Sequence, residues 1–201
     1  MKSIYDFIVK PLGEKYNNKI NIKNKELYLN TKIEGWKFVN RLAIVVETPL
    51  AFDIGIKKGD TVVIHQNVFR TFYNSKGVKK KSRSFFKEDL YFCALDQIYL
   101  YKNNSTWKPV GDRCFVMPIV NNDQFSNKKE KDLIGVLKYD NSSLNSLEIT
   151  SGDLVGYTPN SEWEFLIEGQ RLYCMKSNDI VIKYEYQGNE KEYNPSWARS
   201  G

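Results

Sequence analysis

Short runs of hydrophobic, often β-branched residues alternate along the chain with polar turns, and two of these runs share one pattern. The first is Ile56–Ile64, IKKGDTVVI, and the second is Ile149–Tyr157, ITSGDLVGY. Glycine adopts positive φ at no steric cost and aspartate accepts hydrogen bonds from nearby backbone N–H groups, so each Gly-Asp pair indicates a turn. The apolar run after each pair predicts a strand. Two such turns in matching surroundings predict an internal repeat.

Three further hydrophobic segments recur in the same order around these turns. Relative to the first copy, the second copy is displaced by 107 residues at the first segment, 91 at the second, 93 at the Gly-Asp turn and 82 at the last. The drop from 107 to 91 predicts 16 extra residues between the first and second strands of the first copy, and the drop from 93 to 82 predicts 11 after its Gly-Asp strand. Unrepeated parts are where a specific task is expected. The aligned segments are Phe7–Leu12 with Cys114–Ile119, Arg41–Val46 with Asp132–Leu137, and Leu90–Ile98 with Leu172–Ile180.

The pattern predicts an all-β protein of two tandem small β-barrels, each of five to seven short strands. No apolar stripe with the 3.6-residue period of a helix extends over three turns. A chain of 201 residues is long enough for two domains of ordinary size. We expect a first domain at 1–103 with a long loop 13–40 and a hairpin extension 67–87, a compact second domain at 111–186, and an extended C-terminal tail at 187–201.

The long loop 13–40 has no helical pattern, and loops of this length are usually functional or disordered. Two apolar islands stand in its polar surroundings: Ile20-Asn21-Ile22 and Leu27-Tyr28-Leu29. One interpretation is a short hairpin that packs on its own domain. The other is a partner-binding segment whose islands enter a groove on another protein.

Composition and charge add little that is specific. The 14% aromatic content favours strands, and 41% hydrophobic residues suffice for a core. The net charge of +6 is carried by lysines spread along the chain, so we expect no nucleic-acid partner. The basic and aromatic mixture in 67–87 is also found at single-strand binding sites, but a solvated hairpin tip with an apolar inner face is the favoured interpretation.

The sequence predicts neither catalysis nor a bound cofactor or metal. His65 is the only histidine, no nucleophile motif accompanies it, and no glycine-rich phosphate loop is present. We therefore expect a structural His65. The cysteines Cys93, Cys114 and Cys174 are sparse, form no CxxC pair and fall in strand-like segments, which favours packing in a reducing compartment. No signal peptide and no run long enough to cross a bilayer are found, so a cytoplasmic location and no membrane partner are expected.

The order of these segments resembles the GroES-like co-chaperonins. The resemblance rests on a strand ending in Val9-Lys10-Pro11, a long loop with an apolar triplet, RLAIVV at Arg41–Val46, IKKGDTVV at Ile56–Val63, and LYFCALDQI at Leu90–Ile98. Because the pattern occurs twice, the chain looks like a tandem, two-domain form of the chloroplast type or a phage-encoded relative.

This resemblance implies a non-enzymatic cap for a chaperonin ring that assists protein folding. In the family, a mobile loop inserts its apolar triplet between apical helices of the chaperonin. The implied partner is a GroEL-like ring, the implied assembly is a homo-oligomer, and the location would be host cytoplasm for a phage protein. By position the chaperonin-binding residues are Leu27, Tyr28 and Leu29, with Ile20 and Ile22 in the neighbouring island.

The sequence departs from the family pattern at several points. Lys25 and Glu26 stand where glycines usually precede the triplet, and the second copy has no triplet. The segment Thr48–Gly55, which corresponds to the roof of the family's dome, is short. An alternative is therefore a structural protein, of a virion or other assembly, that reuses tandem GroES-like barrels. A third hypothesis is a nucleic-acid-binding barrel that uses Lys79, Lys80, Lys81 and Arg83.

Overall fold

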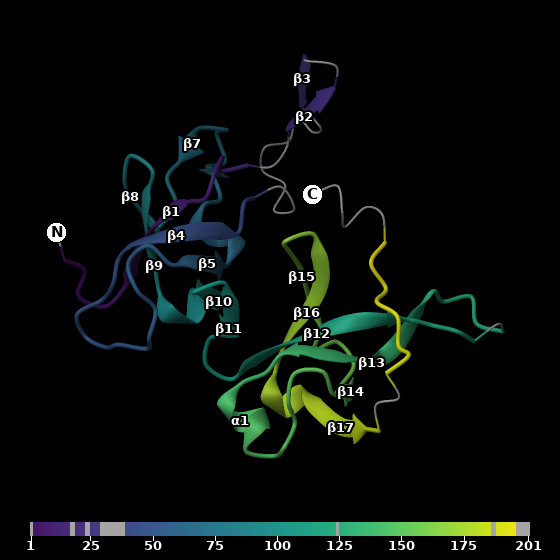
Figure 1. Cartoon of the computed structure of the whole chain (residues 1–201). Helices are drawn as coiled ribbons and strands as arrows, with labels where there is room; N and C mark the ends of the chain where they lie inside the picture. Colours follow the sequence, from purple (N-terminus) through teal and green to yellow (C-terminus); the bar gives the residue numbers. More distant parts are fainter. Residues whose placement is uncertain are drawn as a thin grey trace. The chain divides into compact units, whose positions relative to one another are not determined.

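A computed structural model of the chain describes residues 2–16, 19–22, 25–28, 39–123, 125–185 and 188–195. These residues fold into antiparallel β-sheets in two compact units, Met1–Trp107 and Lys108–Gly201 (Figure 1). The predicted all-β class is confirmed. The described helical segments are one short α-helix, α1 (Ser142–Asn145), and three short 3-10 turns, η2 (Gln66–Val68), η3 (Leu95–Gln97) and η4 (Ser177–Asp179).

The first unit is built on a seven-stranded sheet with the order β11-β10-β5-β4-β1-β9-β8. Two small two-stranded sheets, β2-β3 and β6-β7, lie in the connections that the second unit lacks or shortens. The strands of the main sheet are β1 (Phe7–Pro11), β4 (Leu42–Glu47), β5 (Thr61–Ile64), β8 (Phe85–Lys87), β9 (Leu90–Cys93), β10 (Ile98–Asn103) and β11 (Thr106–Pro109). Those of the small sheets are β2 (Lys19–Ile22), β3 (Lys25–Tyr28), β6 (Phe72–Tyr73) and β7 (Lys79–Lys80).

The second unit is a six-stranded sheet with the order β15-β16-β12-β13-β14-β17. The asparagine before α1, Asn141, caps this helix by accepting a hydrogen bond from the Leu144 N–H at 3.0 Å. The strands are β12 (Arg113–Val120), β13 (Glu130–Tyr139), β14 (Leu154–Tyr157), β15 (Trp163–Ile167), β16 (Gln170–Lys176) and β17 (Ile180–Tyr184).

The two units share one topology. Read from β17, the second sheet runs β17-β14-β13-β12-β16-β15, which matches β10-β5-β4-β1-β9-β8 of the first strand for strand. The register agrees as well: Phe7 pairs with Cys93 in the first unit, and their counterparts Cys114 and Met175 pair in the second. The internal repeat predicted from the hydrophobic pattern is therefore confirmed by strand order and register.

The register corrects one part of the sequence alignment. Val9 pairs with Val45 in the first unit, and its counterpart Val116 pairs with Leu137 in the second. The displacement at this strand is therefore 92 residues, not 91, and the first copy carries 15 extra residues before it, not 16. An alignment that is wrong by one residue assigns every side chain of the strand to the wrong face of the sheet. The sequence misled because the run Leu133–Leu137 matches the first copy almost equally well in either register.

The two Gly-Asp turns have the same hydrogen bonds. Gly59 and Gly152 have φ of +94° and +100°, a conformation that favours glycine. Asp60 accepts from the Lys57 N–H at 2.8 Å, and Asp153 accepts from the Thr150 N–H at 2.8 Å. Both aspartates therefore stabilise their turns, as their repetition predicts.

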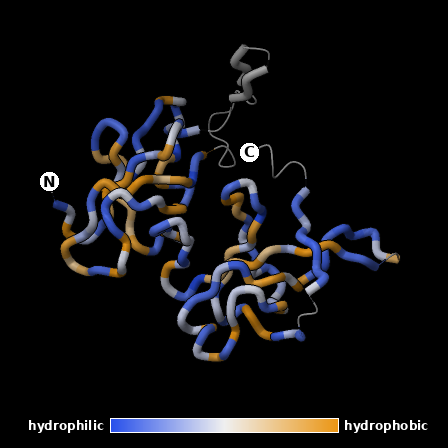
Figure 2. Tube along the Cα trace, in the orientation of Figure 1, coloured by the Kyte–Doolittle hydropathy of each residue, from blue (hydrophilic) through white to orange (hydrophobic). Residues whose placement is uncertain are grey.

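The cores lie on the central strands, with Phe7, Ile8 and Val9 of β1 buried like their counterparts in β12. Figure 2 shows hydrophobic stretches along the strands of both units, separated by hydrophilic turns. The three cysteines are buried and unpaired, which confirms their packing role. Neither main sheet closes on itself by hydrogen bonds among the described strands, so barrel closure stays a prediction.

Replacing Gly135 with alanine is expected to destabilise the second unit by about 3 kcal/mol, because overpacked cores cost energy. A Cβ at Gly135 would lie 2.5 Å from Val116 Cγ1 and 2.6 Å from the Met117 carbonyl oxygen. The counterpart Ala43 accommodates its Cβ, so Ala43→Gly is the matched control and should cost only about 1 kcal/mol. Urea denaturation of both variants measures this, and equal losses would contradict the packing difference between the copies.

Candidate functional site: the arm of the first unit and its root

A principal difference between the two units is the connection 17–38, here called the arm, whose counterpart in the second unit is the shorter loop 121–129. It begins after Tyr16 and ends before Val39, and these two residues form an antiparallel bridge. Inside the arm β2 and β3 pair as a hairpin, with Ile20 opposite Leu27 and Ile22 opposite Lys25 (Figure 1). The described residues of the two apolar islands therefore lie on the two strands of one hairpin.

The register places most of the predicted binding residues on this hairpin. Residues directly opposite one another, and residues two apart, lie on the same face of a strand pair. Ile20, Ile22 and Leu27 therefore occupy one face, while Tyr28, opposite Lys19, occupies the other. Leu29 lies outside the described residues.

A buried asparagine, Asn40, holds the two stems of the arm together at its root. Its side chain donates 2.8 Å hydrogen bonds to the carbonyl oxygens of Leu12 and Glu14, and its Oδ1 accepts from the Leu42 N–H at 2.8 Å. Its backbone N–H donates to the Lys15 carbonyl at 3.0 Å. The Asn40 side chain thus holds the segment after β1 and the segment before β4 together, and these two segments are the ends from which the arm extends.

Two further contacts join the root to the rest of the first unit. The Tyr16 hydroxyl accepts a hydrogen bond from the Thr71 N–H at 2.6 Å. The Lys15 ammonium lies 5.1 Å from the centroid of the Tyr91 ring, and burial lowers the pKa of Lys15 while it raises the pKa of Tyr91. These contacts hold the first residues before the arm in place on the first unit.

Replacing Asn40 with alanine is expected to destabilise the first unit by about 2 kcal/mol, because two carbonyl groups and one N–H lose their partners in a buried site. Limited proteolysis should also cut at the arm sooner than in the parent. Asn74→Ala is the control, since Asn74 accepts two backbone hydrogen bonds in an exposed turn. Unchanged unfolding and cleavage for Asn40→Ala would show that this residue does not hold the root.

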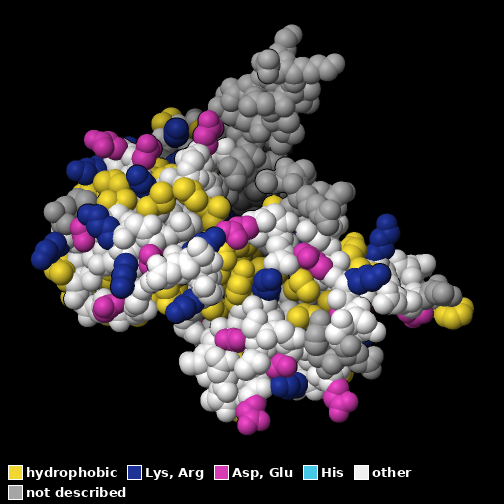
Figure 3. All heavy atoms as spheres, in the orientation of Figure 1, with side chains coloured by type: hydrophobic (Ala, Val, Ile, Leu, Met, Phe, Trp, Pro, Cys, Tyr) yellow, Lys and Arg dark blue, Asp and Glu magenta, His cyan; other side chains and the backbone are white. Residues whose placement is uncertain are grey.

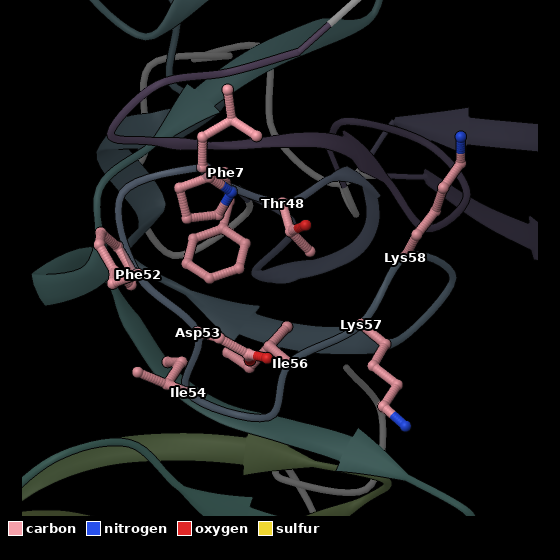
Figure 4. A pocket seen from close by; sticks show the side chains of 10 residues that line it. Phe7, Thr48, Phe52, Asp53, Ile54, Ile56, Lys57 and Lys58 are labelled. Atoms are coloured by element: carbon pink, nitrogen blue, oxygen red, sulfur yellow. The ribbon is translucent and has the colours of Figure 1, made fainter.

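A cavity of about 420 Å³ lies elsewhere in the first unit, under the loop that leads into the first Gly-Asp turn. Figure 4 shows the rings of Phe7 and Phe52 on one side, with their centroids 6.1 Å apart, and the ammonium ends of Lys57 and Lys58 directed away from them. The one carboxylate in its lining, Asp53, accepts a hydrogen bond from the Gly55 N–H at 2.8 Å. The lining offers no paired acid and base, so the cavity suits packing or an apolar contact.

A second cavity, of about 530 Å³, lies in the second unit beside a charge network around the buried Arg171, which sequence reasoning missed. Arg171 donates to Glu130 at 2.7 Å and to Glu164 at 3.1 Å, and Tyr173 donates to Glu130 at 2.7 Å. Burial alone would lower the pKa of Arg171, but these hydrogen bonds outweigh it and raise the pKa. Since every group has a partner, removing one of them leaves another charged group uncompensated. The cavity lining is Lys128, Lys129, Glu130, Asp132, Leu133, Tyr157, Glu162, Tyr173 and Tyr193.

The histidine and the cysteines, which are the residues with catalytic potential, lie in positions that suit a structural role. His65 caps η2 by accepting a hydrogen bond from the Asn67 N–H at 3.1 Å, and burial, with Arg41 nearby, lowers its pKa. Burial raises the pKa of Cys114 and Cys174 to about 12, so neither is a ready thiolate. In the described part of the chain, no cluster of three His, Cys, Asp or Glu residues could hold a metal ion. No helix of the described residues is long and apolar enough to span a membrane.

No protein-family model matches this chain, and no curated protein matches it. The choice among functions therefore depends on the residues and contacts described above.

Proposed function

We propose that this chain is a non-enzymatic co-chaperonin, a tandem pair of GroES-like barrels whose arm binds a chaperonin ring and caps it. One observation carries the proposal: the two units share strand order and register, and among the described residues only the connection after β1 forms a separate hairpin, β2-β3, with apolar residues in both strands. Duplication of a scaffold with an arm on one copy suits a binding function. The resemblance of the repeated segments to GroES-like proteins supports the choice of partner.

The energetics of such an arm favour a multivalent partner. Burying one large aliphatic side chain contributes about 1.5–3 kcal/mol. Ordering the arm on binding consumes a large part of this gain, so a single arm would bind weakly. A homo-oligomer that presents several arms to a ring gains affinity through effective concentration. We therefore propose a ring-shaped homo-oligomer in the cytoplasm, or in the host cytoplasm for a phage protein, with no cofactor of its own.

The test is co-sedimentation of the full chain with a purified GroEL-like chaperonin, with and without ATP, followed by refolding of a denatured substrate protein. The expected result is capture that depends on nucleotide and a higher refolded yield than chaperonin alone gives. A chain that remains in the supernatant under both conditions, and adds nothing to refolding, would exclude the proposal.

The second candidate is a structural protein of a virus particle or other assembly. It is favoured by exposed apolar residues in the first unit: Ile4 is 60% exposed, Tyr5 71% and Leu50 62%. Backbone hydrogen bonds from Leu50 to Ser3 and from Ala51 to Ile4 hold these segments together at the surface. Clustered apolar surface of this kind marks protein contacts. Mass spectrometry of purified particles tests this candidate, and absence of the polypeptide would remove it.

A further inference from the structure

The segment Arg70–Lys87, here called the basic hairpin, contains the entire net positive charge of the protein. It has seven Lys and Arg residues and no Asp or Glu, whereas the whole chain has 30 basic and 24 acidic residues. The remaining 23 basic and 24 acidic residues nearly balance. The cationic character of the protein is therefore local. The seven residues are Arg70, Lys76, Lys79, Lys80, Lys81, Arg83 and Lys87.

The second unit shows that the fold does not require this charge. Its corresponding segment, 158–167, follows β14 and contains β15, and it ends before the turn at Glu168, which matches the turn at Glu88 of the first unit. That segment has two glutamates, Glu162 and Glu164, and no Lys or Arg. Two copies of one scaffold thus carry opposite charges at one place, so the positive charge serves a task of the first copy.

The register of β6 and β7 places exposed aromatic rings opposite lysines. Phe72 pairs with Lys80 and Tyr73 pairs with Lys79. The two rings are 37% and 39% exposed. The turn between the strands is fixed by the Asn74 side chain, which accepts hydrogen bonds from backbone N–H groups at 3.0 and 2.8 Å. Because consecutive strand residues point to opposite faces, the hairpin presents one aromatic ring beside one lysine on each of its two faces.

These cations lack acidic partners in the described part of the chain, where none of the seven forms an ion pair. Arg70 lies over the Phe72 ring, with Cζ 5.4 Å from its centroid, and its buried Nε has no hydrogen-bond acceptor among the described residues. The Lys81 ammonium lies 4.1 Å from the Phe85 centroid. On the face of the first unit seen in Figure 3, Lys and Arg side chains lie among hydrophobic and acidic ones. Like charges gathered in one segment repel, and an anionic partner would relieve that repulsion.

We propose that the basic hairpin binds single-stranded nucleic acid, with phosphates on its Lys and Arg side chains and bases stacked on Phe72 and Tyr73. Basic grooves with exposed aromatic rings are how proteins hold single strands without reading sequence. An acidic peptide would neutralise the cations but would leave both rings uncovered. The sequence alone favoured a solvated hairpin tip, because it does not show that Phe72 and Tyr73 stand opposite Lys80 and Lys79. This inference is independent of chaperonin binding.

The test is fluorescence anisotropy of a labelled 20-nucleotide oligo(dT) with the full chain across a range of salt concentrations. Binding should weaken steeply with salt. Each phosphate contact on a single strand contributes about 0.7 to the slope of log K against log salt concentration, so Lys79→Gln/Lys80→Gln/Lys81→Gln should reduce the magnitude of this slope by about 2. Phe72→Leu/Tyr73→Leu should weaken binding at least about fivefold, because stacking contributes to each base. Lys108→Gln/Lys129→Gln/Lys131→Gln removes the same charge from exposed positions outside the hairpin and should change neither value.

Three outcomes would overturn the proposal. The first is no binding at low salt. The second is equal affinity for polyglutamate together with no loss in the Phe72/Tyr73 variant, which would indicate an acidic protein partner instead. The third is equal affinity for duplex DNA, because paired bases are not available for stacking on the two rings.

Discussion

Replacing Leu27 and Leu29 with aspartate is expected to abolish capture by the chaperonin, with an apparent Kd raised at least about 100-fold, equivalent to roughly 2.7 kcal/mol. Two leucines that become buried contribute about 3–6 kcal/mol together, and two carboxylates placed in an apolar groove add a desolvation penalty. Because several arms act together, the loss in each arm multiplies across the ring. Surface-immobilised chaperonin with the full chain in solution measures the change.

The control for this variant is Val78→Asp/Phe125→Asp, which makes the same charge change at exposed apolar sites. Val78 is 58% exposed at the tip of the basic hairpin, and Phe125 is 97% exposed in the loop of the second unit that corresponds to the arm. This control should bind as the parent does. A Leu27/Leu29 variant that binds chaperonin and supports refolding as well as the parent would show that the arm is not the contact.

Replacing Arg171 with alanine is expected to destabilise the second unit by about 4 kcal/mol, since removing one partner of a buried ion pair leaves the other charge uncompensated. The Arg171 side chain is 10% exposed and the Glu130 side chain 23%, so water screens the loss poorly. Tyr173 would also lose the hydrogen bond that its hydroxyl accepts from Arg171. Urea denaturation followed by tyrosine and tryptophan fluorescence measures the change.

Two variants show whether that loss comes from the uncompensated charge. Arg171→Met/Glu130→Met removes both partners and should recover much of the stability, because an apolar pair of similar size replaces a buried ion pair at little cost. Lys176→Ala breaks an exposed pair with Asp112, 3.5 Å apart, and should change stability by less than about 1 kcal/mol. An Arg171→Ala variant no less stable than Lys176→Ala would contradict the role given to the network.

The repeat could be predicted because its signals are local. Gly59-Asp60 and Gly152-Asp153 specify turns through their own conformations and side-chain hydrogen bonds, and apolar runs on either side specify strands. Because these turns and strands follow one another in the same order in both copies, the two copies could be aligned. The burial of the cysteines followed from the same alignment, since each stands where the other copy has a hydrophobic residue.

The parts that sequence could not supply depend on pairing between distant residues. Glu130 and Arg171 are 41 residues apart, and no local pattern indicates that they meet. The role of Asn40 depends on carbonyl groups 26 and 28 residues away. The islands of the arm were visible, but their register, Ile20 opposite Leu27, was not. The alignment at β13 was wrong by one residue because a run made up mostly of apolar residues does not show which of them face the core.

The most direct test of the account is amide hydrogen exchange of the full chain, measured by mass spectrometry with and without a chaperonin ring in the presence of ATP. The account predicts slower exchange on binding in peptides that cover 19–28, and no change in the corresponding loop 121–129 of the second unit. Slower exchange confined to other segments, or equal changes in both copies, would contradict an arm-borne contact made by the first unit alone.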